Sequence, residues 1–329
     1  MTQKEKLKGI FNVMSANDTL AKAKDTKDSR PLWKEFWYED EVCCLFADAN
    51  VGKSILAVQI AEHIASNVLS NDEKVFYYDF ELSPKQFEKR YTDKNGNSFK
   101  FNERFMRVEL NSDAVKDYCQ ENNASFDEVI SDAIEANITE HNSKVIIVDN
   151  ISWLLNMKAT GNTAGKLMMR LCNLKKKYGL SILVLAHTPK RNLGSAITQN
   201  TLSGSKTLTN FFDSMFAIGM SQTMTGMKYV KQIKVRQGAF KYGEDHVQVC
   251  KINKNGAFLG FETVCFTTEE EQLKGGPKSV SDAVKTPSKA KKHCKRRKAT
   301  GRRALVEKQL SSIDRMVEEE MRKLTEINV

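Results

Sequence analysis

The stretch from Ala47 to Ser54 combines small residues with a lysine and a hydroxyl, and this combination suits phosphate chemistry. Its members are Ala47, Asp48, Ala49, Asn50, Val51, Gly52, Lys53 and Ser54, followed by Ile55. An apolar run precedes the stretch and a helix-like run follows it, so backbone N–H groups and the positive end of the helix can hold phosphates. Lys53 would reach the β- and γ-phosphates, and the Ser54 hydroxyl would help to hold Mg²⁺. The sequence thus predicts an ATP-binding loop at residues 47–55.

This loop departs from the usual pattern at its first position, where Ala47 replaces a glycine. A methyl group is tolerated there if the backbone keeps a negative φ. The alternative is a chance Gly-Lys-Ser in a surface loop, and the strand pattern before it and the helix pattern after it argue against that interpretation.

A second candidate is the acid that ends the apolar run Lys144–Val148. A strand ending in Asp149 places a carboxylate at the carboxyl edge of the sheet, and we expect it beside the strand of the phosphate loop, holding Mg²⁺ through water. Alternatively, Asp149 caps the helix that follows. Asn150, which is not an acid, comes next, so a hydrolase needs a base or water-orienting group from elsewhere.

Two further strand ends carry polar side chains. Glu81 follows the run Val75–Phe80 and is the expected water-positioning group, unless it caps a helix that begins near Ser83. His187 follows Leu180–Ala186 and is expected to sense the γ-phosphate, with a purely structural histidine as the alternative.

Short apolar runs alternate with helix-like stretches from Pro31 to about Thr268, which predicts one α/β unit with a largely parallel sheet. The expected strands are 42–46, 75–80, 144–148, 180–186 and 215–218. Three antiparallel strands are expected after them, at 229–235, 247–252 and 257–262, with a turn at 254–256 joining the last two.

The sequence outside this unit differs in character. Residues 1–30 form a polar N-terminal arm, with a short amphipathic helix expected around Leu7–Met14 and an N-cap at Ser15 or Asn17. Residues 31–268 form the expected ATPase domain, and 269–303 a basic linker predicted to be disordered. Residues 304–329 predict an amphipathic helix, because apolar residues recur at spacings of three and four. These are Val306, Leu310, Ile313, Val317, Met321 and Leu324.

The net charge of +10 comes from one segment of the 329-residue chain. Lys274–Arg303 holds twelve Lys or Arg and one acid, a net of +11, so the rest of the chain is close to neutral. Such a segment binds polyanions without sequence preference, and a solvated linker is the alternative.

Composition excludes several classes of protein. No apolar run approaches the roughly 20 residues of a membrane span, and the N-terminus is charged rather than apolar. The seven cysteines are scattered without a Cys-x-x-Cys pair, which argues against a disulfide scaffold or a zinc site. We therefore expect a soluble cytoplasmic protein with reduced thiols and no membrane partner.

Several longer runs resemble RecA-like ATPases. V-F-Y-Y-D-F-E-L-S-P-K-Q-F-E-K-R at 75–90 resembles the second ATPase motif of DnaB-type replicative helicases, and L-V-L-A-H-T at 183–188 resembles the strand that carries the Gln or His sensor. S-G-S-K-T-L-T-N-F-F-D-S-M-F-A-I at 203–218 resembles the segment after the DNA-facing loop. I-K-V-R-Q-G at 233–238 is similar to the strand end whose cations reach a neighbour's ATP.

The resemblance covers about 32–261 and implies a RecA-like ATPase related to the small hexameric RepA-type helicases of plasmids and mobile elements. It implies that Glu81 is the catalytic glutamate, that His187 is the sensor, and that Lys234 and Arg236 are fingers acting on a neighbouring subunit in a ring. A cation there would stabilise the charge that develops on the transferred phosphoryl group. Ordinary strand-edge charge is the alternative for both cations.

DNA is the expected macromolecular partner, with single strands favoured. The stretches Asn156–Lys166 and Thr188–Lys206 follow core strands at places that line the central channel in the RecA-like fold. Candidate DNA contacts are Lys158, Lys190, Arg191 and Lys206, together with Lys295, Arg296 and Arg297 of the basic segment.

The expected function is Mg²⁺-dependent ATP hydrolysis with water as the acceptor, in a DNA motor or replication accessory of a mobile element. The main alternative is a non-motor ATP switch that regulates replication, transfer or transcription through a protein partner, for which the C-terminal helix is a candidate site. A small-molecule kinase would need a second substrate motif or a lid, and neither is evident in the sequence.

Overall fold

The computed structural model describes residues 11–274 except 71, 152–162, 190 and 203–205. These residues fall in the first of two compact units of the chain, residues 1–284; the second unit, 285–329, lies outside the described part, as does the predicted C-terminal helix. No described helix is long and apolar enough to cross a membrane.

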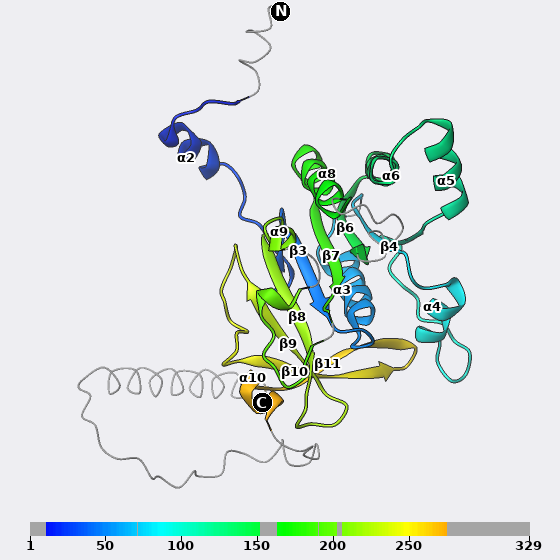
Figure 1. Cartoon of the computed structure of the whole chain (residues 1–329), viewed down its shortest axis with the longest axis vertical. Helices are drawn as coiled ribbons and strands as arrows, with labels where there is room; N and C mark the ends of the chain where they lie inside the picture. Colours follow the sequence, from blue (N-terminus) through cyan, green and yellow to red (C-terminus); the bar gives the residue numbers. More distant parts are fainter. Residues whose placement is uncertain (1–10, 71, 152–162, 190, 203–205, 275–329) are drawn as a thin grey trace, which may run out of the picture. The chain divides into compact units, whose positions relative to one another are not determined.

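A nine-stranded sheet in the order β11-β10-β9-β8-β3-β7-β6-β4-β5 organises the first unit (Figure 1). Its strands are β3 (Val42–Ala47), β4 (Lys74–Asp79), β5 (Phe105–Glu109), β6 (Ser143–Asp149), β7 (Ser181–His187), β8 (Ser214–Met220), β9 (Lys228–Lys234), β10 (Val247–Asn255) and β11 (Phe258–Thr267). The strands from β8 to β5 run parallel, whereas β9, β10 and β11 are antiparallel. This confirms the α/β class with a mainly parallel sheet and an antiparallel C-terminal extension.

Helices cover both faces of the sheet, which explains why its central strands are apolar throughout. All six residues of β3 are buried. Cys43 and Leu45 share a core with α3 (Lys53–Asn67), while Cys44 and Phe46 share the opposite core with α6 (Phe126–His141) and α8 (Thr163–Tyr178). Alternate residues of one strand therefore serve two cores.

The sequence did not predict β5, and it misplaced β6. We expected the strand of Asp149 beside the strand of the phosphate loop, but β6 pairs with β4 and β7, and β7 alone separates it from β3. Strand order is set by how the connecting helices pack, which the apolar runs do not encode.

The remaining elements are short. They are α2 (Ala16–Lys24), β1 (Pro31–Trp33), β2 (Trp37–Tyr38), α4 (Pro84–Arg90), α5 (Ser112–Glu121), η1 (Gln199–Thr201), α9 (Lys206–Thr209) and α10 (Glu269–Leu273). The helix expected over Leu7–Met14 is wrong in its described part, because 11–14 is not helical. The predicted cap is confirmed: the Ser15 side chain accepts from the Asp18 N–H and starts α2.

The folded body extends past the boundary expected at residue 268. Glu269, the first residue of α10, is 2% exposed and accepts from the Ile197 N–H at 2.9 Å, the Tyr229 hydroxyl at 3.1 Å and Lys231 Nζ at 2.5 Å. An ion pair with such complete hydrogen bonding holds α10 to the body, so the linker expected from 269 cannot begin before Lys274.

Candidate active site

The phosphate loop connects β3 to α3, and the φ angles of its backbone suit the residue types of its sequence. Ala47 ends β3 and is not among the residues of positive φ, so its methyl group causes no strain. Asn50 and Gly52 do have positive φ, 59° and 111°. Lys53 is the first residue of α3, which directs the N-terminus of that helix toward the loop.

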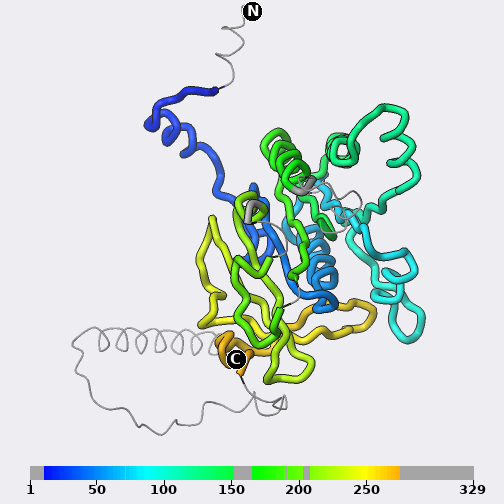
Figure 2. Tube along the Cα trace, in the orientation of Figure 1, coloured from blue at the N-terminus to red at the C-terminus, as the bar shows by residue number. Residues whose placement is uncertain are grey.

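The hairpin of β10 and β11 packs on this loop, a contact that the sequence did not suggest. A Cβ on Gly52 would lie 2.7 Å from Ile252 Cδ1 and 3.0 Å from Phe261 Cζ. The Gln59 side chain of α3 donates to the Phe261 carbonyl at 3.0 Å and accepts its N–H at 2.7 Å. Figure 2 shows this hairpin, in yellow, reaching α3. Gly52 is therefore required both for its φ and for this close approach.

Lys53 is largely buried, and its ammonium group has specific acceptors. Nζ donates to the carbonyls of Ala47 and Asp48, at 3.1 and 3.0 Å, and lies 3.0 Å from His187 Nδ1. An ammonium has no lone pair, so Nδ1 accepts and the proton of the neutral ring is on Nε2. Burial lowers the pKa of Lys53, and Asp149, Glu81 and Asp48 oppose that shift.

His187 connects the phosphate loop to Glu81 through its second nitrogen. Nε2 lies 3.7 Å from Glu81 Oε1 and 3.1 Å from Asn150 Nδ2, and that amide donates to Glu81 Oε1 at 2.5 Å. Hydrogen bonding to His187 is the main cause of the lowered pKa of Glu81, and Asn150 and Lys53 add to it against the effect of burial. Glu81 is therefore held ionised at neutral pH. The sequence did not reveal that Asn150 is its hydrogen-bond partner.

A buried ion pair fixes the backbone around Glu81. Asp79 Oδ1 accepts the N–H groups of Glu81 and Leu82, at 3.2 and 2.9 Å, while its Oδ2 pairs with Arg107 Nε at 2.9 Å. Arg107 also donates to the Leu82 carbonyl at 2.6 Å. Because Arg107 lies on β5, which the apolar pattern did not predict, its role could not be found from the sequence.

The capping alternative for Glu81 is wrong. Ser83 caps α4, and Gln86 completes a capping box with it. The Glu81 side chain instead faces Asn150 and His187.

The Asp149 side chain is almost fully buried, and one of its two carboxylate oxygens is free to bind a cation. Burial raises its pKa to about 6, although the hydroxyls of Ser54 and Tyr77 act in the opposite direction. Tyr77 donates to Oδ2, whereas Oδ1 is buried with no hydrogen-bond partner in good geometry among the described residues. A carboxylate oxygen left unpaired beside the first-turn hydroxyl of a phosphate loop suits Mg²⁺, which takes oxygen ligands from protein and phosphate together.

Lys234 and Arg236 lie at the other edge of the sheet from the phosphate loop. Lys234 donates to the Phe212 carbonyl at 2.5 Å, and Arg236 pairs with Asp213 at 2.9 Å. Asp213 in turn accepts the N–H of Val42, the first residue of β3, whereas the loop follows the last. Neither cation can reach the phosphate loop of its own chain without rearrangement of the fold.

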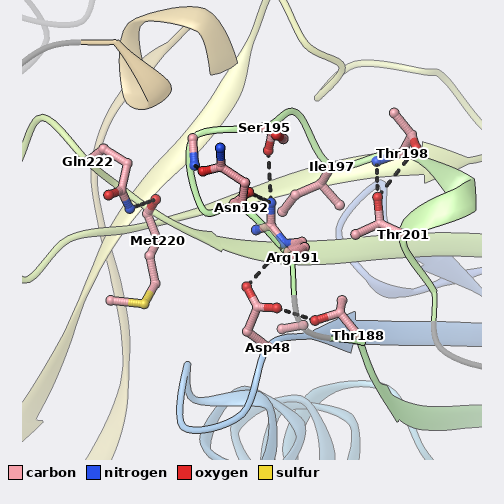
Figure 3. Close-up of polar contacts among 12 residues, drawn as sticks. Asp48, Thr188, Arg191, Asn192, Ser195, Ile197, Thr198, Thr201, Met220 and Gln222 are labelled. Carbon is pink, nitrogen blue, oxygen red and sulfur yellow. Dashed lines mark hydrogen bonds and ion pairs between the residues drawn. The ribbon is translucent and has the colours of Figure 1, made fainter.

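Arg191, expected to contact DNA, lies against the phosphate loop instead. Its Nε is 3.2 Å from Asp48 Oδ2, its Nη1 donates to the Ser195 carbonyl at 2.8 Å, and its side chain is 10% exposed (Figure 3). The Thr188 hydroxyl donates to the second oxygen of Asp48. These contacts tie the chain after β7 to the phosphate loop.

Of the other expected DNA contacts, only Lys206 is among the described residues. Lys158, Lys190, Lys295, Arg296 and Arg297 lie outside the described residues. Lys206 begins α9, and the described end of the stretch expected at 156–166 belongs to α8 rather than to a loop.

A phosphate loop after the central strand β3, with polar side chains at the carboxyl ends of β4, β6 and β7, defines a P-loop NTPase domain built on a mainly parallel sheet. The chain belongs to the AAA domain family, whose model matches residues 11–192, more than half of its length. That match includes Lys53, Glu81, Asp149 and His187. Lys234 and Arg236 lie beyond it.

Among solved structures, the chain is similar to the KaiC-like protein PH0186 of the hyperthermophilic archaeon Pyrococcus horikoshii OT3. The two share 14% identity with a TM-score of 0.48, over 69% of this chain and 91% of the other. No curated protein matches the chain by sequence.

Proposed function

We propose that the chain hydrolyses ATP with Mg²⁺ and water at the carboxyl edge of β3, β4, β6 and β7. The observation that carries the proposal is the line from Lys53 through His187 to Glu81. Lys53 Nζ lies 3.0 Å from His187 Nδ1, and His187 Nε2 lies 3.7 Å from Glu81 Oε1, to which Asn150 donates at 2.5 Å. This line joins a phosphate-binding cation to an ionised carboxylate, as a hydrolase that positions water beside a γ-phosphate requires.

Each side chain then has a defined task. Lys53 binds the β- and γ-phosphates, and Ser54 and Asp149 hold Mg²⁺, which neutralises phosphate charge when bound. Glu81, fixed by Asn150 and by the backbone contacts of Asp79, orients the attacking water.

His187 suits the role of γ-phosphate sensor because Lys53 donates to it directly. When phosphates bind, Lys53 exchanges its present acceptors for phosphate oxygens, and Nδ1 of His187 loses its donor. The ring can then change tautomer and offer a proton on Nδ1 to the γ-phosphate, while its contact with Glu81 changes as well.

Self-association follows from the proposed role of the two cations after β9. Lys234 and Arg236 are remote from the loop of their own chain, so they can act as fingers only on a neighbour's ATP. Arg236 suits this role, since its side chain is 67% exposed although it pairs with Asp213.

We favour a ring-forming motor or replication accessory that acts on DNA, with the basic segment 274–303 as the main source of DNA affinity. One observation favours the alternative, an ATP switch acting on a protein partner: Arg191 is engaged by Asp48 rather than offered to a phosphate backbone. In the switch, the chain after β7 would transmit the nucleotide state of the loop to a partner.

The test is the ATPase rate of the full chain with and without single-stranded DNA, alongside its mass by light scattering with ATP bound. A motor requires a multimer and a rate that rises with DNA. A multimer or monomer whose rate ignores DNA indicates the switch, and phosphate transfer to a metabolite would indicate a kinase. Lys53→Ala is the control, and hydrolysis at the normal rate in that variant would refute the site itself.

A further inference from the structure

An apolar cavity of about 460 Å³ opens between the ends of β4 and β5 and the helices α5 and α6. Its lining includes Tyr78, Phe80, Val108, Leu110, Tyr118 and Ile134. None of Lys53, Glu81, Asp149 or His187 lines it. The proposed ATPase reaction therefore does not account for this cavity.

Helix α5 lies beside α6 and forms the exposed wall of the cavity (Figure 1). None of the residues of α5 is buried, yet Ala114, Val115 and Tyr118 line the cavity, and Tyr118 is 54% exposed. An apolar stripe on a surface helix, next to an open cavity, forms the kind of groove that receives the apolar face of another helix. We call the cavity and this stripe the α5 groove.

Carboxylates surround the α5 groove. From Glu109 to His141 the chain holds nine Asp or Glu against a single Lys. Four of these acids pair with Arg107, Arg170 or Lys177. Those that form no ion pair within the described part of the chain include Asp113, Asp117, Glu121 and Asp132. The surroundings of the groove are therefore negatively charged, which attracts basic ligands and repels nucleic acids and anionic membranes.

The four unpaired acids follow the geometry of the groove. Asp113, Asp117 and Glu121 recur every four residues, so they form one stripe along α5, next to the stripe of Ala114 and Tyr118. Asp132 of α6 itself lines the cavity. The acidic stripe repeats about every 6 Å, because each residue of a helix rises about 1.5 Å. Lysines or arginines four residues apart on a second helix repeat at the same interval, beside an apolar face of their own.

We propose that the α5 groove is the docking site for a basic amphipathic helix of another protein. The apolar face of that helix seats against Tyr118 and in the cavity, while its lysines or arginines pair with Asp113, Asp117, Glu121 and Asp132. Because the lining contains none of the proposed ATPase residues, this interaction does not depend on the proposed reaction.

A synthetic helix tests the proposal on the full chain. The probe is a fluorescent peptide of about 18 residues, with leucines along one face, lysines beside them at every fourth position and alanines elsewhere. Fluorescence anisotropy measures its dissociation constant. A peptide of the same composition in scrambled order keeps the charge but loses the apolar face. We expect the probe to bind at least about tenfold more tightly than the scrambled peptide. Equal affinities would overturn the proposal.

The acidic stripe is tested by Asp113→Asn combined with Asp117→Asn. The probe should bind at least about fivefold more weakly, and its affinity should depend less on salt between 0.1 and 0.5 M than with the wild type. The matched control, Asp72→Asn with Glu103→Gln, removes two exposed acids outside the groove and should leave the affinity unchanged. An equal loss in both variants would show general charge attraction and would refute a site at α5.

The apolar part of the groove is tested by Ala114→Asp and Ala133→Asp, at two exposed positions that line the cavity. Each change adds a negative charge, which strengthens simple attraction, but places it where leucines of the probe should seat. We expect binding at least about fivefold weaker. The control Thr139→Asp adds the same charge at an exposed position of α6 outside the lining, and should not weaken binding. Tighter binding to Ala114→Asp would refute apolar docking.

Two further measurements keep this test independent of folding and of other occupants. The urea midpoint of each variant should match that of the wild type, so that a loss of binding is not a loss of the fold. If Ala114→Asp instead turns a multimer into a monomer in light scattering, the groove is an interface between copies of this chain. If the probe binds a chain ending at Lys274 but not the full chain, the groove is not open to a partner. Either result would overturn the proposal.

Discussion

Replacing Asp149 by asparagine should make the nucleotide-free protein more stable while it abolishes hydrolysis. The wild-type carboxylate is 1% exposed, and one of its oxygens has no hydrogen-bond partner within the described residues. Such a charge is unfavourable for folding in the absence of a cation. Asparagine keeps the shape and the acceptor for Tyr77 but carries no charge.

The size of the expected stabilisation follows from the pKa of Asp149, which folding raises from 3.8 to about 6. A shift of that size corresponds to about 3 kcal/mol at pH 8, where the carboxylate is ionised in both the folded and the unfolded chain. Asparagine places an amide N–H at the position of the unpaired oxygen, where the Ser54 hydroxyl is the nearby acceptor. Burying this imperfectly paired N–H reduces the stability of the variant by about 1 kcal/mol. The variant should therefore be more stable than wild type by about 2 kcal/mol at pH 8.

The pH dependence has a definite sign. Because the folded pKa is above the unfolded one, the folded state holds its proton more tightly, and wild-type stability declines as pH rises from about 4 to 6. The penalty is fully present above pH 7 and is only about 1 kcal/mol at pH 4.5. The advantage of Asp149→Asn should therefore nearly vanish at pH 4.5.

Urea unfolding of both proteins at pH 8 and pH 4.5, with EDTA and without nucleotide, measures the difference through the midpoint and slope. The control is Asp79→Asn, since Asp79 is equally buried but paired with Arg107. That change breaks an ion pair and should destabilise by at least about 1 kcal/mol. If Asp149→Asn is no more stable than wild type at pH 8, or equally stabilised at both pH values, the account of this carboxylate is refuted.

Three further predictions concern the reaction and its partners. Glu81→Gln should bind ATP nearly normally, since Asn150 can still donate to the side-chain oxygen. Its ATP turnover should be at least about 10²-fold slower than that of the wild type. A normal rate would exclude Glu81 as the water-positioning group. Arg236→Ala should be inactive alone but regain activity when mixed with Lys53→Ala, and a multimer without rescue would argue against fingers acting in trans. A chain ending at Lys274 should keep its basal ATPase, provided the deleted residues do not assemble the ring. It should lose most DNA affinity and salt dependence in a binding titration, and an unchanged salt slope would show the basic segment to be a solvated linker.

The sequence alone determined those features that depend on neighbouring residues. The phosphate loop was identifiable because strand, loop and helix follow one another within a few residues, and positive φ at Gly52 is a local requirement. Buried parallel strands were recognised by continuous apolar runs, since both faces of the sheet are covered. Even the antiparallel hairpin was predicted, by its turn at Gly256.

Tertiary structure decided which strand ends meet. The apolar runs could not reveal that β7 lies between β3 and β6, and this order brings His187 to Lys53. Arg107 could not be assigned because β5 is a partly exposed edge strand with a weak apolar pattern.

Contacts between distant residues also explain why the structure gives Asn150 and Arg191 other roles than their sequence neighbourhoods indicate. The residue type of Asn150 shows only that it carries no charge, because its partner Glu81 is 69 residues away in sequence. The basic surroundings of Arg191 in the sequence favour a DNA contact, but Asp48, 143 residues away, holds its side chain at the phosphate loop. Contacts between distant residues depend on strand order and helix packing over the whole core, and no local pattern of residue types specifies them.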